Sequence, residues 1–305
     1  MILRHEAKVP KRMPDTPDHP ASCALPQDLP APPPARRVER VQLRDGDVCA
    51  GSRAVPEEVP VALTFNGTTH AVMMASPTDI ADFALGFSLT EGIVASAAEI
   101  LSLDVIVVEE GIEARMWIAE EKMTHLSARR RALAGPTGCG LCGVESLAEA
   151  VKPAALVAAG TRFSAATVLE AMAALGPLQG LNHETRAVHA AAYFEPGRGI
   201  LAVMEDVGRH NALDKLVGRA ADAGFETGRG ILLLTSRVSI EMVQKASVLG
   251  TGVIAAVSAP TSLAIRTAQA AGLTLCAVVR ADGFEIFTHP GRIDLHSSER
   301  HTHVA

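Results

Sequence analysis

The stretch Ile231-Leu232-Leu233-Leu234-Thr235-Ser236-Arg237-Val238-Ser239-Ile240-Glu241 joins a short apolar run to polar residues and then to the start of an amphipathic pattern. The apolar run predicts a buried strand, and the pattern over residues 240–249 predicts a helix. The same order recurs over residues 200–223 and 253–271, and a further strand is predicted at 273–279. Buried strands that alternate with helices indicate an α/β domain in which helices cover a sheet.

The part of the chain before this domain predicts a smaller domain of mixed composition. Residues 59–65 and 69–74 alternate in hydrophobicity, and Asn66-Gly67 between them predicts a hairpin. The stretch Ser76-Pro77-Thr78-Asp79 then predicts the start of a helix, whose apolar face carries Ile80, Phe83, Ala84 and Phe87. A second strand pair is predicted at residues 105–108 and 114–118. The fold class is therefore α/β in the second half and α+β overall.

These patterns divide the 305 residues into four parts. Residues 1–36 hold nine of the eighteen prolines and few bulky apolar residues, which predicts a disordered tail. An N-terminal α+β domain is expected over 37–128, an arginine-rich approach and a cysteine loop over 129–143, and the α/β domain over 144–305. Two further helices are predicted near the start of this α/β domain, at residues 144–151 and 164–175.

Composition narrows the functional classes. Five cysteines in a long chain argue against a disulfide scaffold and for a reducing compartment. The formal charge of −6, with one Trp and one Tyr, gives no sign of nucleic-acid binding. No apolar run approaches the length of a membrane span, and no signal-peptide pattern opens the chain. We therefore expect a cytoplasmic protein that binds neither nucleic acid nor membrane.

The stretch Thr137-Gly138-Cys139-Gly140-Leu141-Cys142-Gly143 places two thiols in a glycine-rich loop. Glycine allows tight turns and leaves little side-chain cover, so both Cys139 and Cys142 are expected to be accessible. Arg129, Arg130 and Arg131 lie just upstream, where positive charge favours a thiolate. A single CxxC is compatible with nucleophilic, redox or metal-binding chemistry, and its spacing alone does not choose among them.

Polar residues follow three of the predicted strands. Because ligands bind beyond the carboxyl ends of the strands in such sheets, these residues predict a phosphate pocket built from hydroxyls, arginine and helix N-termini. They are Asp206, Gly208, Arg209, His210 and Asn211, then Thr235, Ser236, Arg237 and Ser239, and finally Ser258, Thr261 and Ser262.

Each of these positions also has a structural interpretation. Ser239, Ser258 and Thr261 taken singly are more often helix caps than ligand-binding groups. His189, in an apolar segment, is by default a hydrogen-bonded core histidine, and His210 is as well explained by function as by structure. Asp214 and Lys215 are expected on a solvated helix face or in an ion pair.

The chain resembles the FdhD family, the sulfur carriers needed to make formate dehydrogenase active. The resemblance covers about residues 55 to 293 and rests on several motifs in the family's order. They are the CxxC loop, Glu205-Asp206-Val207-Gly208-Arg209-His210-Asn211-Ala212-Leu213-Asp214-Lys215, Ser236-Arg237-Val238-Ser239 with Gln244-Lys245-Ala246, Ser258-Ala259-Pro260-Thr261-Ser262-Leu263-Ala264, Thr288-His289-Pro290-Gly291-Arg292, and in the first domain Leu85-Gly86-Phe87 with Thr90-Glu91-Gly92. One departure is Arg186-Ala187, where the family usually has two glycines before the histidine at position 189.

The resemblance implies a sulfurtransferase that takes persulfide sulfur from a cysteine desulfurase. It implies transfer of that sulfur to the bis-molybdopterin guanine dinucleotide molybdenum cofactor, for the catalytic subunit of formate dehydrogenase. Cys139 would carry the persulfide and Cys142 would assist it. The second domain would be cytidine-deaminase-like in fold, and the protein would pair as a homodimer.

A guanine dinucleotide cargo implies that GDP-like nucleotides bind at the strand ends. One further segment is expected to close one side of that pocket, namely Val278, Val279, Arg280, Ala281, Asp282 and Gly283.

Three alternatives remain to be weighed against the sulfur carrier. A zinc deaminase needs a His-x-Glu element before its cysteines, and no histidine upstream of Cys139 has glutamate two residues later. A structural zinc site normally needs four ligands, and the chain offers one cysteine pair. In a thioredoxin-like thiol-disulfide protein, the CxxC should open a helix directly after a strand, whereas here it follows Gly135-Pro136.

Overall fold

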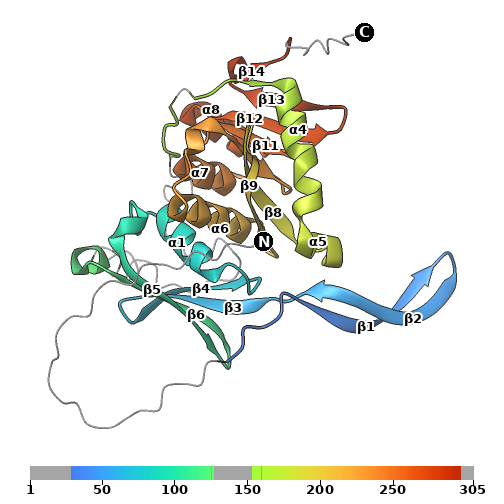
Figure 1. Ribbon diagram of the computed structural model, residues 1–305, viewed down its shortest axis with the longest axis vertical. Helices are drawn as coiled ribbons and strands as arrows, with labels where there is room; N and C mark the ends of the chain where they lie inside the picture. The colour runs from blue at the N-terminus through green and yellow to red at the C-terminus, as the bar shows by residue number, and fades with distance from the viewer. Residues whose placement is uncertain (1–28, 125, 127–152, 159, 297–305) are drawn as a thin grey trace.

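The computed structural model describes residues 29–124, 126, 153–158 and 160–296. The predicted tail up to residue 28, the arginine run at 129–131, the cysteine loop and the predicted helix at 144–151 lie outside the described residues. In Figure 1 the described part consists of a six-stranded sheet with helices, a four-stranded sheet with the helix α1 (Ile80–Thr90) and a further helical stretch that includes residues 120–124, and a projecting hairpin.

The six-stranded sheet forms the second half of the chain. Its strand order is β13-β12-β11-β10-β8-β9. The strands β10, β11 and β12 are parallel, and β8 runs antiparallel to both of its neighbours, so β9 points the same way as β10. The bounds are β8 His189–Glu195, β9 Gly199–Asp206, β10 Ile231–Leu234, β11 Val253–Ala256, β12 Thr274–Arg280 and β13 Gly283–Thr288.

Helices cover both faces of this sheet. Three helices pack on one face around a common core, namely α6 (Arg209–Asp222), α7 (Ile240–Leu249) and α8 (Ser262–Ala271). The helix α4 (Ala165–Leu175) packs on the other face and is followed by the short α5 (Gly180–Thr185). Because both faces are covered, every residue of β10 and β11 is buried, which explains their uninterrupted apolar sequences. The prediction of a sheet covered by helices is confirmed.

The four-stranded sheet has the order β4-β3-β6-β5. Its strands are β3 (Val59–Phe65), β4 (Thr68–Ala75), β5 (Ile100–Val108) and β6 (Gly111–Ile118). The predicted hairpin is confirmed: β3 and β4 are antiparallel around Asn66 and Gly67, both with positive φ. The helix α1 (Ile80–Thr90) packs on one face and buries Phe83 and Ala84.

The two sheets are joined by a close crossing of α1 with α6. Gly86 and Gly218 stand at the contact point, and a Cβ at Gly86 would lie 1.7 Å from the carbonyl oxygen of Asp214. A Cβ at Gly218 would lie 1.9 Å from the carbonyl oxygen of Asp82. Only glycine allows the two backbones to approach this closely.

The projecting hairpin, here called the arm, consists of β1 (Ala35–Arg44) and β2 (Asp47–Pro56). The sequence did not predict it, and β1 begins at Ala35, so it includes the last two residues of the expected tail. Asp45 and Gly46 form its turn with positive φ, which suits a two-residue hairpin. Its base contacts α5, where Arg53 donates to the carbonyl oxygen of Thr185, and its tip projects away from the body in Figure 1.

Short elements complete the described chain. The strands β7 (Phe163–Ser164) and β14 (Ile293–Asp294) pair in parallel beside α4. Single 3-10 turns lie at Ala97–Glu99, Gly176–Leu178, Thr227–Arg229 and Pro290–Arg292. None of the described helices is both long and apolar enough to cross a membrane.

Candidate functional site

The predicted site residues converge on one edge of the six-stranded sheet. Since β9, β10, β11 and β12 point the same way, their carboxyl ends share this edge. The first residue of β8 lies there too, because His189 pairs with Asp206 at the end of β9. The sequence therefore predicted the location of the polar cluster, but it did not place His189 within it.

Asp206 forms the buried base of this edge rather than an open contact surface. Its carboxylate accepts hydrogen bonds from the backbone N–H of Ser76 at 3.0 Å and of Gly208 at 2.7 Å. It also accepts one from Nδ2 of Asn211 at 3.0 Å and forms an ion pair with Lys215. Asn211 in turn donates to the carbonyl oxygen of Met74 at 2.8 Å. Asp206 and Asn211 therefore hold the end of β9 to the four-stranded sheet.

The expectation of a solvated face at Asp214 and Lys215 is wrong, because both side chains are buried. The alternative, an ion pair, is correct, although the two residues pair with other partners rather than with each other. Lys215 binds Asp206 at 2.7 Å, while Asp214 binds Nζ of Lys245 at 2.7 Å and the hydroxyl of Thr90 at 2.7 Å. Both pairs lie where α6 meets the first domain or α7, so burial required each charge to have a partner.

Several predicted hydroxyls have internal partners. Thr235 accepts from the N–H of Ala190 at 2.8 Å, and Ser236 donates to the carbonyl oxygen of Arg237. Thr261 caps α8 by accepting from the N–H of Ala264, which matches its structural interpretation. Ser262 accepts from Arg266. These groups shape the edge of the sheet.

Two buried polar atoms at this edge lack a hydrogen-bond partner among the described residues, namely Nε of Arg209 and Nε2 of His210. The hydroxyl of Ser239 lies beside the carboxylate of Glu241 and helps to lower its pKa. Arg209 and His210 open α6 and Ser239 precedes α7, and neither helix has a side-chain cap. Buried polar groups are normally paired, so these atoms offer hydrogen bonds to a molecule from outside the chain. Arg237 is exposed beside them.

The histidines of this edge are held neutral. Burial, then the positive charges of Arg209 and Lys245, lower the pKa of His210 to about 4, against the opposing effect of Glu241. Burial and Arg209 also lower the pKa of His189. Two neutral imidazoles beside a half-buried arginine form a site suited to an acceptor-rich or anionic group.

The segment Val278–Gly283 forms the end of β12 and the turn into β13 at this same edge. The N–H of Val278 donates to the carbonyl oxygen of Ser258, and Val278 has a φ of 54°, which marks an irregularity in the strand. Arg280 donates to the carbonyl oxygen of Val257. Val279 is buried, whereas Arg280, Ala281 and Asp282 flank the turn; all six residues adjoin the ends of β11 and β12.

The departure from the family at Arg186 falls on a special backbone conformation. Arg186 follows α5 with a φ of 57° and a ψ of 31°, in the left-handed region. Glycine enters this region without strain, whereas a residue with a Cβ pays about 1–2 kcal/mol. Arg186 therefore adopts a backbone conformation that glycine would adopt without strain.

The described cysteines do not belong to this edge. Burial raises the pKa of Cys276 to about 12, so that thiol is inert, and Cys49 is exposed on the arm. Cys139, Cys142 and the arginines at 129–131 lie outside the described residues.

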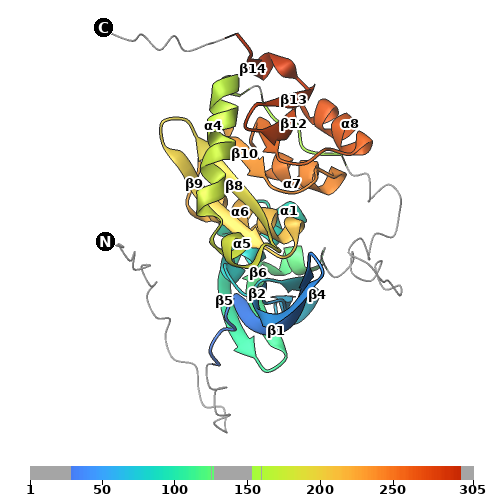
Figure 2. The same ribbon diagram turned by 90° about the vertical axis from the view of Figure 1, so that its right-hand side faces the viewer.

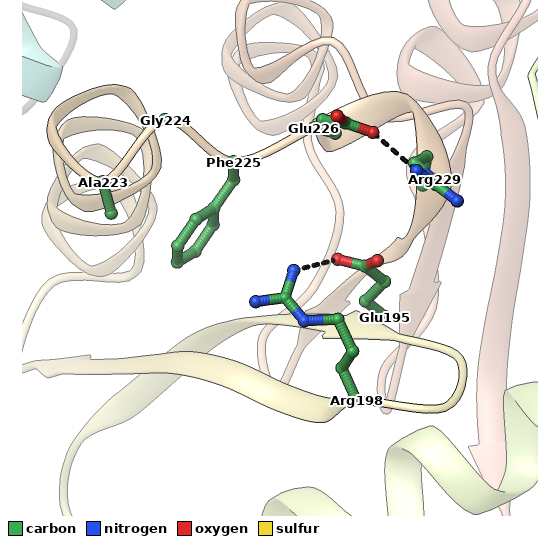
Figure 3. A pocket seen from close by; sticks show the side chains of 7 residues that line it. All are labelled: Glu195, Arg198, Ala223, Gly224, Phe225, Glu226 and Arg229. Carbon is green, nitrogen blue, oxygen red and sulfur yellow. Dashed lines mark hydrogen bonds and ion pairs between the residues drawn. The ribbon is translucent and has the colours of Figure 1, made fainter.

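A pocket of about 410 Å³ lies at the opposite end of the sheet and contains none of the predicted residues. Figure 3 shows Phe225 on one side and two ion pairs, Arg198 with Glu195 and Arg229 with Glu226, on the other. Each arginine there is already neutralised by a glutamate. Most of its residues come from turns, so no sequence pattern indicated this pocket.

Three residues at the strand-end edge were quoted in sequence motifs but were not predicted as site residues: Ser76, Glu241 and Lys245. Ser76 meets Asp206 and Val207, Glu241 lies on the first turn of α7, and Lys245 joins Asp214. The usable signal was the burial pattern of α7, in which a lysine occupies a core-facing position.

The sequence of this chain is similar to that of known proteins. The family model described as FdhD/NarQ matches residues 56–294. Sulfur carrier protein FdhD of Agrobacterium fabrum is 52% identical over 261 residues, which cover 85% of this chain and 96% of that protein. The protein of the same name from Brucella abortus is 53% identical over 260 residues, covering 85% and 97%.

A solved structure shows the same fold. The crystal structure of a candidate formate dehydrogenase accessory protein from Desulfotalea psychrophila superposes with a TM-score of 0.69 at 24% identity. The match covers 86% of this chain and all of the other chain. With the family model spanning more than half of its length and relatives above 50% identity, the chain belongs to the FdhD/NarQ family.

Proposed function

We propose that this protein is a sulfur carrier that takes persulfide sulfur from a cysteine desulfurase and delivers it to the bis-molybdopterin guanine dinucleotide molybdenum cofactor. The observation that carries the proposal is the 52–53% identity to proteins named sulfur carrier protein FdhD. The matched family region, 56–294, includes Cys139 and Cys142. The zinc and thiol-disulfide alternatives have no comparable support.

The sulfur transfer can be written with the two thiols of the loop. The thiolate of Cys139 attacks the outer sulfur of the desulfurase persulfide; the S–S bond breaks and the desulfurase thiolate leaves. For release, the thiolate of Cys142 attacks the inner sulfur of the Cys139 persulfide. A Cys139–Cys142 disulfide forms and sulfide leaves, so that the two thiols supply both electrons. A cellular dithiol then reduces the disulfide.

The strand-end edge supports binding of the cargo. A guanine dinucleotide offers phosphate and base oxygens, which are hydrogen-bond acceptors. The edge provides the buried Nε–H of Arg209, the hydroxyl of Ser239, the exposed Arg237 and the N-termini of α6 and α7. Because Asp206 and Asn211 are used internally, we assign them to positioning α6 rather than to direct contact.

The remaining parts of the proposal concern partners. The loaded cofactor would pass to the catalytic subunit of formate dehydrogenase. The protein would act in the cytoplasm, as a homodimer. We also propose that the second domain has a cytidine-deaminase-like fold.

Mass spectrometry tests the sulfur-carrying step. The protein is incubated with a cysteine desulfurase and cysteine, and the intact mass is measured without reductant. We expect one added sulfur that Cys139→Ala abolishes and that Cys142→Ala retains. Cys49→Ala is the matched control, because Cys49 is an exposed thiol on the arm, away from the strand-end edge. Retention of the sulfur in Cys139→Ala would contradict the assignment.

A further inference from the structure

The pocket of about 410 Å³ at the opposite end of the six-stranded sheet, here called the far-end pocket, has no part in the functions described so far. It is lined by the turn between β8 and β9 and by the segment that follows α6 (Figure 3). Helix α6 begins at the strand-end edge with Arg209 and ends at Asp222, next to this pocket. Its volume is within the range of about 300–1,000 Å³ that small-molecule sites occupy.

The apolar wall of the far-end pocket is held in place by internal contacts. Tyr193 is fully buried and stacks against Phe225, with ring centroids 5.7 Å apart and the ring planes at 28°. The hydroxyl of Tyr193 donates to the carbonyl oxygen of Glu226 at 3.1 Å. The N–H of Phe225 donates to the carbonyl oxygen of Ala220 at 2.9 Å, which fixes the end of α6. Because this wall is already ordered, a ligand loses little affinity to ordering it.

Two ion pairs supply four charges to the other side of the pocket (Figure 3). Arg198 donates through Nη1 to Oε2 of Glu195 at 2.9 Å, and Arg229 donates through Nη1 to Oε2 of Glu226 at 2.8 Å. The hydrogen bond and the charge of Arg229, with a further contribution from the charge of Arg198, lower the pKa of Glu226. The two pairs therefore form one cluster, and its formal charge is zero.

Each ion pair uses one atom on either side and leaves the other polar atoms open. A guanidinium has five N–H donors and a carboxylate has two oxygens, and each pair here is a single hydrogen bond between Nη1 and Oε2. The side chain of Arg198 is 62% exposed and that of Glu226 is 71% exposed, so a ligand can reach both. The cluster can therefore bind a carboxylate and an ammonium group without breaking either ion pair.

The zero net charge of the cluster selects the class of ligand. An anion would be attracted by the two arginines and repelled by the two glutamates, and a cation would meet the reverse. A zwitterion can place an opposite charge at each group. The head group of an α-amino acid carries a carboxylate and an ammonium group on one carbon. An aromatic side chain on that carbon would extend the stack of Tyr193 and Phe225.

We propose that the far-end pocket binds a free α-amino acid with an aromatic side chain. The carboxylate of the ligand accepts from the open N–H groups of Arg198, its ammonium group donates to the carboxylate of Glu226, and its ring packs on Phe225. Binding here does not depend on the sulfur-carrier function, because none of these residues belongs to the strand-end edge or to the cysteine loop.

Calorimetry with L-phenylalanine and three of its analogues tests each contact separately. L-Phenylalanine should bind with a Kd of about 1 mM or below. The analogue 3-phenylpropionate lacks the ammonium group and phenethylamine lacks the carboxylate. Each should bind at least about tenfold more weakly, the loss expected for a hydrogen bond to a charged group. L-Leucine keeps both charges but has no ring, and it should bind about two- to tenfold more weakly.

Two substitutions assign the two charges of the head group. Arg198→Gln should weaken L-phenylalanine and 3-phenylpropionate but not phenethylamine, which has no carboxylate. Glu226→Gln should weaken L-phenylalanine and phenethylamine but not 3-phenylpropionate. A change in the shape of the pocket would weaken all three ligands alike, so the pattern separates a contact from a structural role. Arg115→Gln is the matched control, because it breaks an exposed arginine–glutamate pair in the four-stranded sheet and should leave all affinities unchanged.

Three results would overturn the proposal. The first is the absence of saturable binding of L-phenylalanine at millimolar concentrations. The second is binding of any of the three analogues as tightly as L-phenylalanine, since the site would then not recognise both charges and the ring together. The third is a pair of variants, Arg198→Gln and Glu226→Gln, that bind L-phenylalanine as the parent does or that weaken all ligands equally. Circular dichroism should show both variants folded, because both side chains are more than half exposed.

Discussion

The ammonium group of Lys215 lies 2.7 Å from the carboxylate of Asp206, and neither side chain is exposed at all. The pair is located where the end of β9 meets the segment before α1. Lys215 also donates to the carbonyl oxygen of Ser76 at 3.1 Å, and the N–H of Ser76 donates to Asp206. The pair therefore ties the six-stranded sheet to the four-stranded sheet directly beneath the strand-end edge.

Lys215→Met should destabilise the protein strongly. Methionine fills most of the lysine volume, but it leaves the Asp206 carboxylate buried without its counter-charge. Removing one partner of a buried ion pair costs about 3–5 kcal/mol. Urea unfolding should show a loss of this size. Arg229→Met, which breaks the exposed pair with Glu226, should cost less than about 1 kcal/mol. Equal losses in the two variants would contradict a structural role for the buried pair.

The sequence predicted the elements whose local pattern agrees with their environment. Strand β10 and helix α7 were predicted at their observed bounds, because a run buried on both sides is apolar throughout and the helix after it is amphipathic. The arm was not predicted, because its strands are exposed on both faces and carry no clear alternation. Strand β8 was not identified, because its AAA run is compatible with either a helix or a strand.

The candidate site was predictable by location and not by role. Polar residues after each strand indicated the edge, since parallel strands end together. Which of these residues face inward depends on contacts between segments far apart in the sequence. Asp206 meets Ser76 across 130 positions, and Asn211 meets Met74 across 137. No local pattern reports such contacts, so Asp206 and Arg209 could not be told apart from the sequence.

Gly218→Ala should destabilise the junction between α1 and α6, even though alanine favours helices by about 1 kcal/mol. The added methyl group would lie 1.9 Å from the backbone oxygen of Asp82, so the helices must separate. Overpacking of this kind costs about 1–3 kcal/mol or more. Thermal unfolding measures the loss. Gly176→Ala, where no atom lies within 4 Å of the new methyl group, is the control and should be neutral. If Gly218→Ala left thermal stability unchanged, the backbones of α1 and α6 would not be in close contact at this position.

Stability should fall on acidification because His210 is held neutral. The unfolded chain binds a proton at this residue near pH 6.5, whereas the folded chain does so only at about 4. Between these values the unfolded state binds more protons, so the free energy of unfolding decreases as the pH falls. Since His210 keeps some contact with solvent, we expect a loss of about 1–2 kcal/mol, smaller than full burial would give.

The pH dependence can be assigned by substitution. His210→Gln should flatten the decrease in the free energy of unfolding between pH 6.5 and 4, measured by urea titration at each pH. His189 shifts in the same direction, so part of the slope should remain. His183→Gln, at an exposed position on α5, is the control and should keep the full slope. An unchanged slope in His210→Gln would show that other groups carry the effect.

Nucleotide binding tests the strand-end edge itself. Calorimetry should show that the protein binds GDP in preference to ADP. The substitution Arg237→Ala should make the free energy of GDP binding less favourable by roughly 1–3 kcal/mol, the cost of losing a hydrogen bond to a charged group. This corresponds to a loss of affinity on the order of tenfold to a hundredfold.

Cys139→Ala should bind GDP normally, because cargo binding and sulfur carrying use different residues. Arg198→Ala, an exposed arginine at the opposite end of the sheet, should also bind normally, which separates a specific phosphate contact from a general loss of positive charge. Equal affinity for GDP and ADP would mean that the edge recognises phosphate and not guanine, and an unaffected Arg237→Ala would move the phosphate contact to Arg209 and the helix N-termini beside it.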